Sequence, residues 1–242
     1  MSDPPIVWRR NARSRRISLR VDPRNGHVVL TLPPRASRRD GLRLLASHAD
    51  WVQERLRRLP DPAPFAAGAT VPVDGAPCPI IHDGAGRGGT WLAPDGLHVS
   101  GEAEFLPRRV GDFLRREAGR RFSAAAHEAA GRAGLKPGRI TVKDTRSRWG
   151  SCTARGGLMF NWRLLMAPPF VQHYVVAHEV AHLRHMNHAP AFWALVDELT
   201  PHRAAASAWL TANGPALMRV GPGATAPLPP TAAWSVQPGR PA

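Results

Sequence analysis

Residues 178–188, HEVAHLRHMNH, decide how this chain folds, because they hold a complete metal-binding pattern in one short stretch. The first five residues have the form H-E-x-x-H, and positions i and i+4 of an α-helix lie one above the other. His178 and His182 can therefore offer imidazole nitrogens to one ion. Glu179 is the next residue round the helix, where a carboxylate can take a proton from water at that ion. The stretch predicts a helix that carries a hydrolytic metal site.

Chance does not account for this pattern. With eleven His and seven Glu among 242 residues, H-E-x-x-H would arise by shuffling about 0.015 times per chain. The alternative is a set of solvated or core histidines on an ordinary helix. The preceding residues favour the metal helix, because Pro168 and Pro169 supply a helix start and apolar residues follow at helical spacing: Phe170, Val171, Tyr174, Val175 and Val176.

Two histidines compete to be the third ligand. His185 lies seven residues after His178, and seven residues of helix rise span about 10.5 Å. Nitrogens about 2.0–2.1 Å from one zinc must lie close together, so three histidines along a straight helix cannot converge. His188 follows Asn187, a residue that tolerates the left-handed conformation that ends helices. We therefore expect the chain to turn there and to bring His188 back, with His185 as the alternative.

A family resemblance rests on these residues. The stretch 178–193, HEVAHLRHMNHAPAFW, and the upstream stretch 148–152, RWGSC, resemble the bacterial YgjP-like metal-dependent hydrolases, relatives of the SprT-like and WLM zinc peptidases. The resemblance extends more loosely over residues 5–215. It implies a compact zincin fold, peptidase activity, the zinc ligands His178, His182 and His188, and Glu179 as general base.

Composition limits the function classes. The formal net charge is +15, yet only Lys136 and Lys143 are lysine and the other 31 basic residues are arginine. Arginine, alanine, proline and glycine together are what a GC-rich genome favours through codon usage, so a nucleic-acid partner is possible but not favoured. Cys78 and Cys152 are too few for a disulfide framework. The absence of an apolar signal region or membrane-length stretch predicts a cytoplasmic protein without a membrane partner.

Local patterns predict the order of the elements. Alternation over residues 6–33, with Asn25-Gly26 as the turn, predicts a β-hairpin. Ser37 and Asp40 resemble a helix cap, and helical spacing continues to a stop at Pro60. Further patterns predict a linker over 60–69, two or three strands over 70–99, a long helix over 107–133, and strands over 139–144 and 158–164.

We therefore expect an α+β, zincin-like metallopeptidase fold with an N-terminal β-rich portion. The expected domain organisation is a hairpin, helix and linker over 1–69, a catalytic domain over 70–220, and a disordered tail over 221–242. Zincins commonly run a strand beside the active-site helix where an extended peptide can pair, and residues 157–161 are the candidate; an ordinary core strand is equally compatible. Residues 149–152 fit either a loop at the cleft or a packed turn.

The expected mechanism is zinc-assisted hydrolysis of a peptide or protein substrate, in which the ion lowers the pKa of water toward about 7 and Glu179 accepts its proton. Arg146, Arg148 and His202 are candidate oxyanion donors. One alternative is a nucleic-acid-binding protein with a structural metal. It fits less well, because a structural zinc usually has four protein ligands. Another is a protease directed to DNA-bound substrates. The sequence does not define the oligomeric state.

Overall fold

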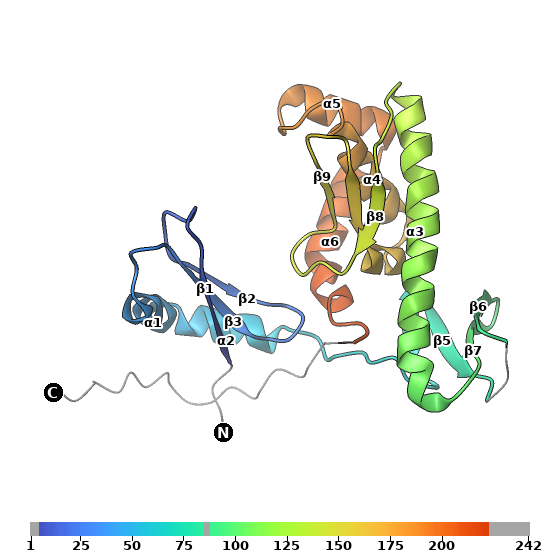
Figure 1. Cartoon of the computed structure of the whole chain (residues 1–242), viewed down its shortest axis with the longest axis horizontal. Coiled ribbons are helices and arrows are strands. Elements are labelled where there is room, and N and C mark those ends of the chain that lie inside the picture. Colours follow the sequence, from blue (N-terminus) through green and yellow to red (C-terminus); the bar gives the residue numbers. More distant parts are fainter. Residues whose placement is uncertain (1–4, 85–87, 223–242) are drawn as a thin grey trace. The chain divides into compact units, whose positions relative to one another are not determined.

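The computed structural model describes residues 5–84 and 88–222 (Figure 1). These residues form three small sheets, six α-helices and two short 3-10 helices. The predicted α+β class is confirmed. The described residues divide into two compact units, 5–62 and 63–222. The tail predicted from residue 221 lies, from residue 223 onward, outside the described residues.

The N-terminal unit begins with a three-stranded sheet of order β1-β3-β2. Strands β2 (Ser18–Val21) and β3 (Val28–Leu32) form the predicted antiparallel hairpin. Gly26 in its turn has a φ of 67°, a left-handed conformation that glycine adopts without steric cost. Strand β1 (Ile6–Arg10) pairs in parallel with β3 on its other side.

Two helices cover this sheet, where the sequence predicts one. Helix α1 (Arg38–Ser47) begins with the predicted capping box between Ser37 and Asp40. It ends at His48 (φ −122°, ψ 20°), and α2 (Ala49–Arg57) starts directly after it. Side chains compete with the helical ladder here, because Ser47 Oγ donates to the Leu44 carbonyl at 2.9 Å and His48 Nδ1 lies 3.0 Å from it. Apolar residues of β3, α1 and α2 form the core of the unit: Val28, Leu30, Leu45, Val52 and Leu56.

The second unit opens with a four-stranded sheet of order β4-β5-β7-β6, so the prediction of two or three strands is wrong. It is made of two antiparallel hairpins: β4 (Thr70–Val73) with β5 (Ala76–His82), and β6 (Thr90–Ala93) with β7 (Gly96–Val99). Each hairpin turns within two residues, which local alternation does not resolve into separate strands. The two hairpins join by parallel pairing of β5 with β7.

Helix α3 (Leu106–Arg132) confirms the predicted long helix and follows η1 (Ala103–Phe105). Its buried residues recur every three or four positions, which gives one apolar face: Val110, Leu114, Ala118, Phe122, Ala126 and Ala129. Figure 1 shows α3 running along unit 63–222, from β5 and β7 to β8 and α4. The helix therefore packs against both sheets of this unit.

The second sheet of the unit has the order β8-β10-β9. Strands β8 (Ile140–Lys143) and β10 (Leu158–Asn161) are the predicted strands. The stretch predicted to continue the second strand instead forms η2 (Trp162–Met166), because the Asn161 side chain accepts from the Arg163 N–H at 3.0 Å and caps a helical turn. Strand β9 (Gly150–Cys152) was not predicted and forms one edge of the sheet, antiparallel to β10.

Three helices complete the unit: α4 (Pro169–Ala181), α5 (Pro190–Leu199) and α6 (Arg203–Leu217). Helix α4 contacts α3, α5, α6 and β9, and most of its residues are buried. It is therefore the central helix, and its C-terminal end holds the H-E-x-x-H residues. None of the described helices combines the length and the apolar character needed to span a membrane.

Candidate metal centre and active site

Helix α4 presents His178 and Glu179 in its last turn and ends immediately after them. His182 is the C-cap and keeps nearly helical dihedrals (φ −65°, ψ −16°), so it still lies one turn above His178. The expected left-handed helix end at Asn187 is wrong, because α4 already ends at Ala181 and Asn187 has no positive φ. The chain does bend at Asn187, whose Oδ1 accepts from the Ala189 N–H at 3.3 Å. After His182 the helix tightens into a turn with bonds from the Leu183 and Arg184 N–H groups to the Val180 and Ala181 carbonyls, at 2.9 and 3.2 Å. Asp74 is the sole non-glycine residue with positive φ in the described ranges.

The loop after α4 brings His188 to the two helix histidines. Nε2 of His188 lies 3.2 Å from Nε2 of His178, and the candidate ligand atoms of His178, His182 and His188 all lie within 4.8 Å of one another. Two nitrogens about 2.0–2.1 Å from a tetrahedral ion lie about 3.3–3.4 Å apart. The observed spacing therefore fits three ligands of one ion, and His185 is not part of this cluster.

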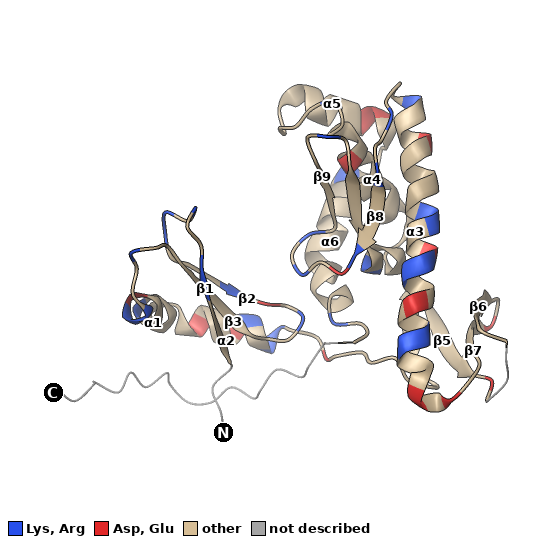
Figure 2. Ribbon diagram, in the orientation of Figure 1, with Lys and Arg blue, Asp and Glu red and all other residues tan. Residues whose placement is uncertain are grey.

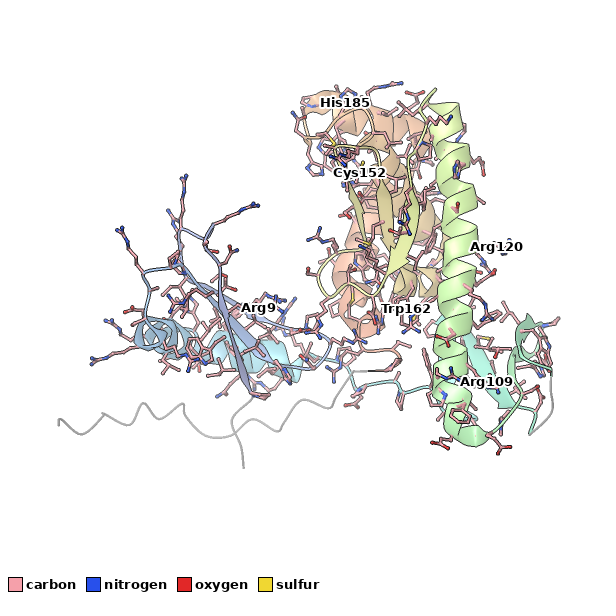
Figure 3. The ribbon with its side chains drawn as sticks, in the orientation of Figure 1. Arg9, Arg109, Arg120, Cys152, Trp162 and His185 are labelled. Atoms are coloured by element: carbon pink, nitrogen blue, oxygen red, sulfur yellow. The ribbon has the colours of Figure 1, made fainter. Side chains whose placement is uncertain are left out.

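His185 contributes to the arrangement through its main chain. Its carbonyl oxygen lies 2.9 Å from Nδ1 of His182, so a proton on Nδ1 can donate to it. That bond leaves the lone pair of His182 Nε2 for a metal, which is how the partner group of a ligand histidine commonly sets its tautomer. Figure 3 shows His185 at the end of unit 63–222 where α5 lies.

Helix α5 supplies an aromatic wall for the cluster. Phe192 is fully buried, and its ring centroid lies 4.9, 4.5 and 4.7 Å from those of His178, His182 and His188. The ring of Trp193 stacks on that of His188 at 5.5 Å. Burial lowers the pKa of His178 to about 4, an effect that the neighbouring histidines strengthen. A neutral imidazole is the form that binds a metal, so this environment favours coordination.

Strand β9 positions Glu179 beside the cluster. The Glu179 side chain is 6% exposed, and burial raises its pKa to about 7, while the positive charge of Arg148 opposes the rise. A Cβ on Gly150 would lie 2.4 Å from Glu179 Oε1, so the carboxylate rests directly on the Gly150 backbone. The sequence alternatives of a loop or a packed turn are wrong for residues 150–152, which form the strand that supports the acid, while Trp149 lies in a bend just before it.

Of the two alternatives for residues 157–161, the ordinary core strand is confirmed and the substrate strand is wrong. Strand β10 pairs with β8 on one side and β9 on the other, so residues 158–161 have no free main-chain edge. Strand β9 is the one that lies beside α4, and within the described sheet nothing pairs with its outer edge. An extended peptide could pair there.

The oxyanion candidates lie in different places. Arg148 is close enough for its charge to act on Glu179, and with Arg146 it lines an open groove of about 690 Å³ along the β8-β10-β9 sheet. His202 packs edge-on against Phe170 and lines a separate cavity of about 230 Å³ with residues of α3 and His173. Its cavity lining contains none of the three clustered histidines, so the structure does not bring His202 to them.

The site as a whole defines a class of protein. Three histidines from one helix and its following loop converge, and a buried acid follows the first of them, an arrangement that fits a metal-dependent hydrolase. A family model described as "YgjP-like, metallopeptidase domain" matches residues 15–213, so the chain belongs to the YgjP-like metallopeptidase family. The predicted resemblance is confirmed.

The chain is similar to a solved structure described as the metallopeptidase zymogen of Pyrococcus abyssi abylysin, with 20% sequence identity and a TM-score of 0.34. The similarity covers 37% of this chain and 92% of that one. No curated protein matches the chain.

Proposed function

We propose that the protein is a zinc-dependent peptidase in which His178, His182 and His188 hold the ion and Glu179 is the general base. The observation that carries the proposal is the convergence of three imidazoles beside a carboxylate that is itself buried. Three nitrogen ligands suit zinc. They also leave a coordination position open, as catalytic sites do and structural four-ligand sites do not.

A zinc ion held by these residues would polarise the peptide carbonyl and lower the pKa of water. Glu179 then has two tasks, to accept a proton from the attacking water and to deliver it to the leaving amine. Its position supports both tasks, because Gly150 and burial hold the carboxylate in one place on the helical turn that carries His178 and His182. A pKa near neutrality suits a group that must take up and release a proton.

The outer edge of β9 supports binding of an extended substrate. Strand β9 contacts α4, and its first residue touches Glu179. A peptide that pairs with β9 would therefore pass the general base with its main chain held by hydrogen bonds. Peptide or protein is thus the substrate class that the family and this edge both support.

Hydrolysis of a mixed peptide library, followed by mass spectrometry, tests the proposal. We expect cleavage that disappears with a chelator and returns with zinc. Glu179→Gln keeps the side chain's shape and removes the base, so it should bind zinc normally and lose about 100- to 10,000-fold in turnover. Normal turnover in Glu179→Gln would remove this residue from the mechanism.

A further inference from the structure

A groove that no step of the proposed mechanism uses opens next to the histidine cluster. It has a volume of about 840 Å³, within the range of about 300–1,000 Å³ typical of ligand pockets. Tyr174 and Trp193 line it. Both side chains also touch the cluster, Tyr174 edge-on to His178 at 5.9 Å and Trp193 stacked on His188 at 5.5 Å. A ligand in the groove would therefore be separated from the histidine cluster by the thickness of one aromatic side chain.

The floor of this groove, which we call the α6 groove, is one face of α6. Ala204, Ala208 and Ala212 lie four residues apart on that face, and all three are exposed. Small side chains keep this face of α6 open, and the buried Tyr174 and the partly buried Trp193 are the aromatic residues of the lining. The shape is that of a trough able to take a bulky group.

The charge of the α6 groove favours an uncharged occupant. Arg203 is the one charged residue in its lining. Its guanidinium already lies 3.3 Å from the Asp197 carboxylate and 4.8 Å from the centre of the Trp193 ring. Because this charge is compensated, an acidic side chain would gain little there. An apolar or aromatic side chain would instead bury surface against the alanines and the two rings.

We propose that the α6 groove is a specificity pocket that binds a large apolar or aromatic side chain of the peptide, next to the bond that is cut. The inference rests on the proposed function. It defines the substrate class as peptides with a bulky apolar residue beside the cleavage site, and it makes α6 rather than the metal helix the element that selects among peptides.

Binding of two hydroxamates, which attach to the metal through the same group, tests this pocket without any need for turnover. We expect the N-acetyl-phenylalanine hydroxamate to bind the zinc-loaded protein about tenfold or more tightly than its N-acetyl-glycine analogue, because it alone buries a ring. Tyr174 is the single tyrosine of the chain. Isotope-labelled tyrosine therefore gives ring signals from Tyr174 alone. Because this ring also lies edge-on to His178, both compounds can shift the signals, and the shift should be clearly larger with the phenylalanine compound.

Two exposed alanines of α6 provide matched variants. Ala208→Trp fills the floor, so the affinity ratio of the two compounds should fall to near one. Ala205→Trp makes the same change at an exposed position outside the lining, so the ratio should persist. Equal binding of both compounds to the wild type, binding of neither, or a ratio that survives Ala208→Trp would overturn the inference.

Peptide cleavage separates this inference from the proposed function. If peptides are cut without preference for bulky apolar residues and the two hydroxamates bind equally, the pocket is refuted and the peptidase stands. If no peptide is cut but the hydroxamate ratio and its loss in Ala208→Trp are observed, the binding of a bulky apolar group in the α6 groove stands, whereas the peptidase and the role of the groove in peptide selection are refuted.

Discussion

Gly150→Ala should disable the proposed general base without touching a metal ligand. The added Cβ would lie 2.4 Å from Glu179 Oε1, whereas ordinary contact begins at 3.4 Å, so the carboxylate must move by about 1 Å. Glu179 is buried and cannot swing into solvent at little cost. A misplacement of about 1 Å in an active site costs about 100-fold, or about 2.7 kcal/mol of transition-state stabilisation. We therefore expect kcat/KM to fall about 100-fold at unchanged zinc content.

The assay compares four variants with the wild type on the best peptide from the library. Gly119→Ala is the matched control, because a Cβ there meets nothing within 4 Å and activity should remain at the wild-type level. If Gly150→Ala acts through Glu179, the double variant Gly150→Ala/Glu179→Gln should be no slower than Glu179→Gln alone. Wild-type activity in Gly150→Ala, or a full further 100-fold loss in the double variant, would refute the reasoning.

Two further predictions concern charge. Hydrogen bonds from Arg120 and Arg121 lower the pKa of Glu117 to about 2 from 4.5, so its contribution to stability is present above pH 4.5 and disappears as the pH falls toward 2. Glu117→Gln should therefore reduce the free energy of unfolding by about 1 kcal/mol at pH 7 and by much less near pH 2, measured by urea titration. In the same ion pairs, and in the pair of Arg115 with Asp112, arginines of α3 lie next to acids (Figure 2). Single-stranded DNA should therefore not accelerate peptide hydrolysis at about 150 mM salt. Clear stimulation would instead support a DNA-directed protease.

Sequence patterns that involve only residues close to one another in the chain predicted much of the fold. The capping box at Ser37 and the length of α3 depend on residues within one or two helical turns, and both are confirmed. The interruption of the first helix at His48 was missed, since it depends on how two side chains bond to one carbonyl. Periodicity reports which face of an element is apolar and carries no information on such competition.

The sequence did not predict which distant segments pair with one another. The parallel contact of β1 with β3 and the central place of β10 depend on which strands meet in space. The support of Glu179 by Gly150 is of the same kind, because it exists only once β9 packs on α4. A glycine inside a strand often marks such a close approach, and this was the one available signal.

The histidine cluster depends partly on local spacing, which the sequence predicted, and partly on packing between distant segments, which it did not. The spacing of His178 and His182 follows from the helix, and the limited reach of a helix predicted that His188 would approach them more closely than His185. The structure has that arrangement, but the helix ends at Ala181, and the bend at Asn187 forms without the left-handed conformation expected there. The wall formed by Phe192 depends on the packing of α5 and had no local signal. The role of the three histidines as ligands stays a prediction.

The zinc content of two single variants tests the central claim most directly. Elemental analysis should find one zinc per chain in the wild type and in His185→Ala, because that substitution keeps the carbonyl that bonds to His182. His188→Ala removes a nitrogen of the cluster and should lose most of the metal after dialysis. Full zinc in His188→Ala together with loss in His185→Ala would contradict the metal centre described above.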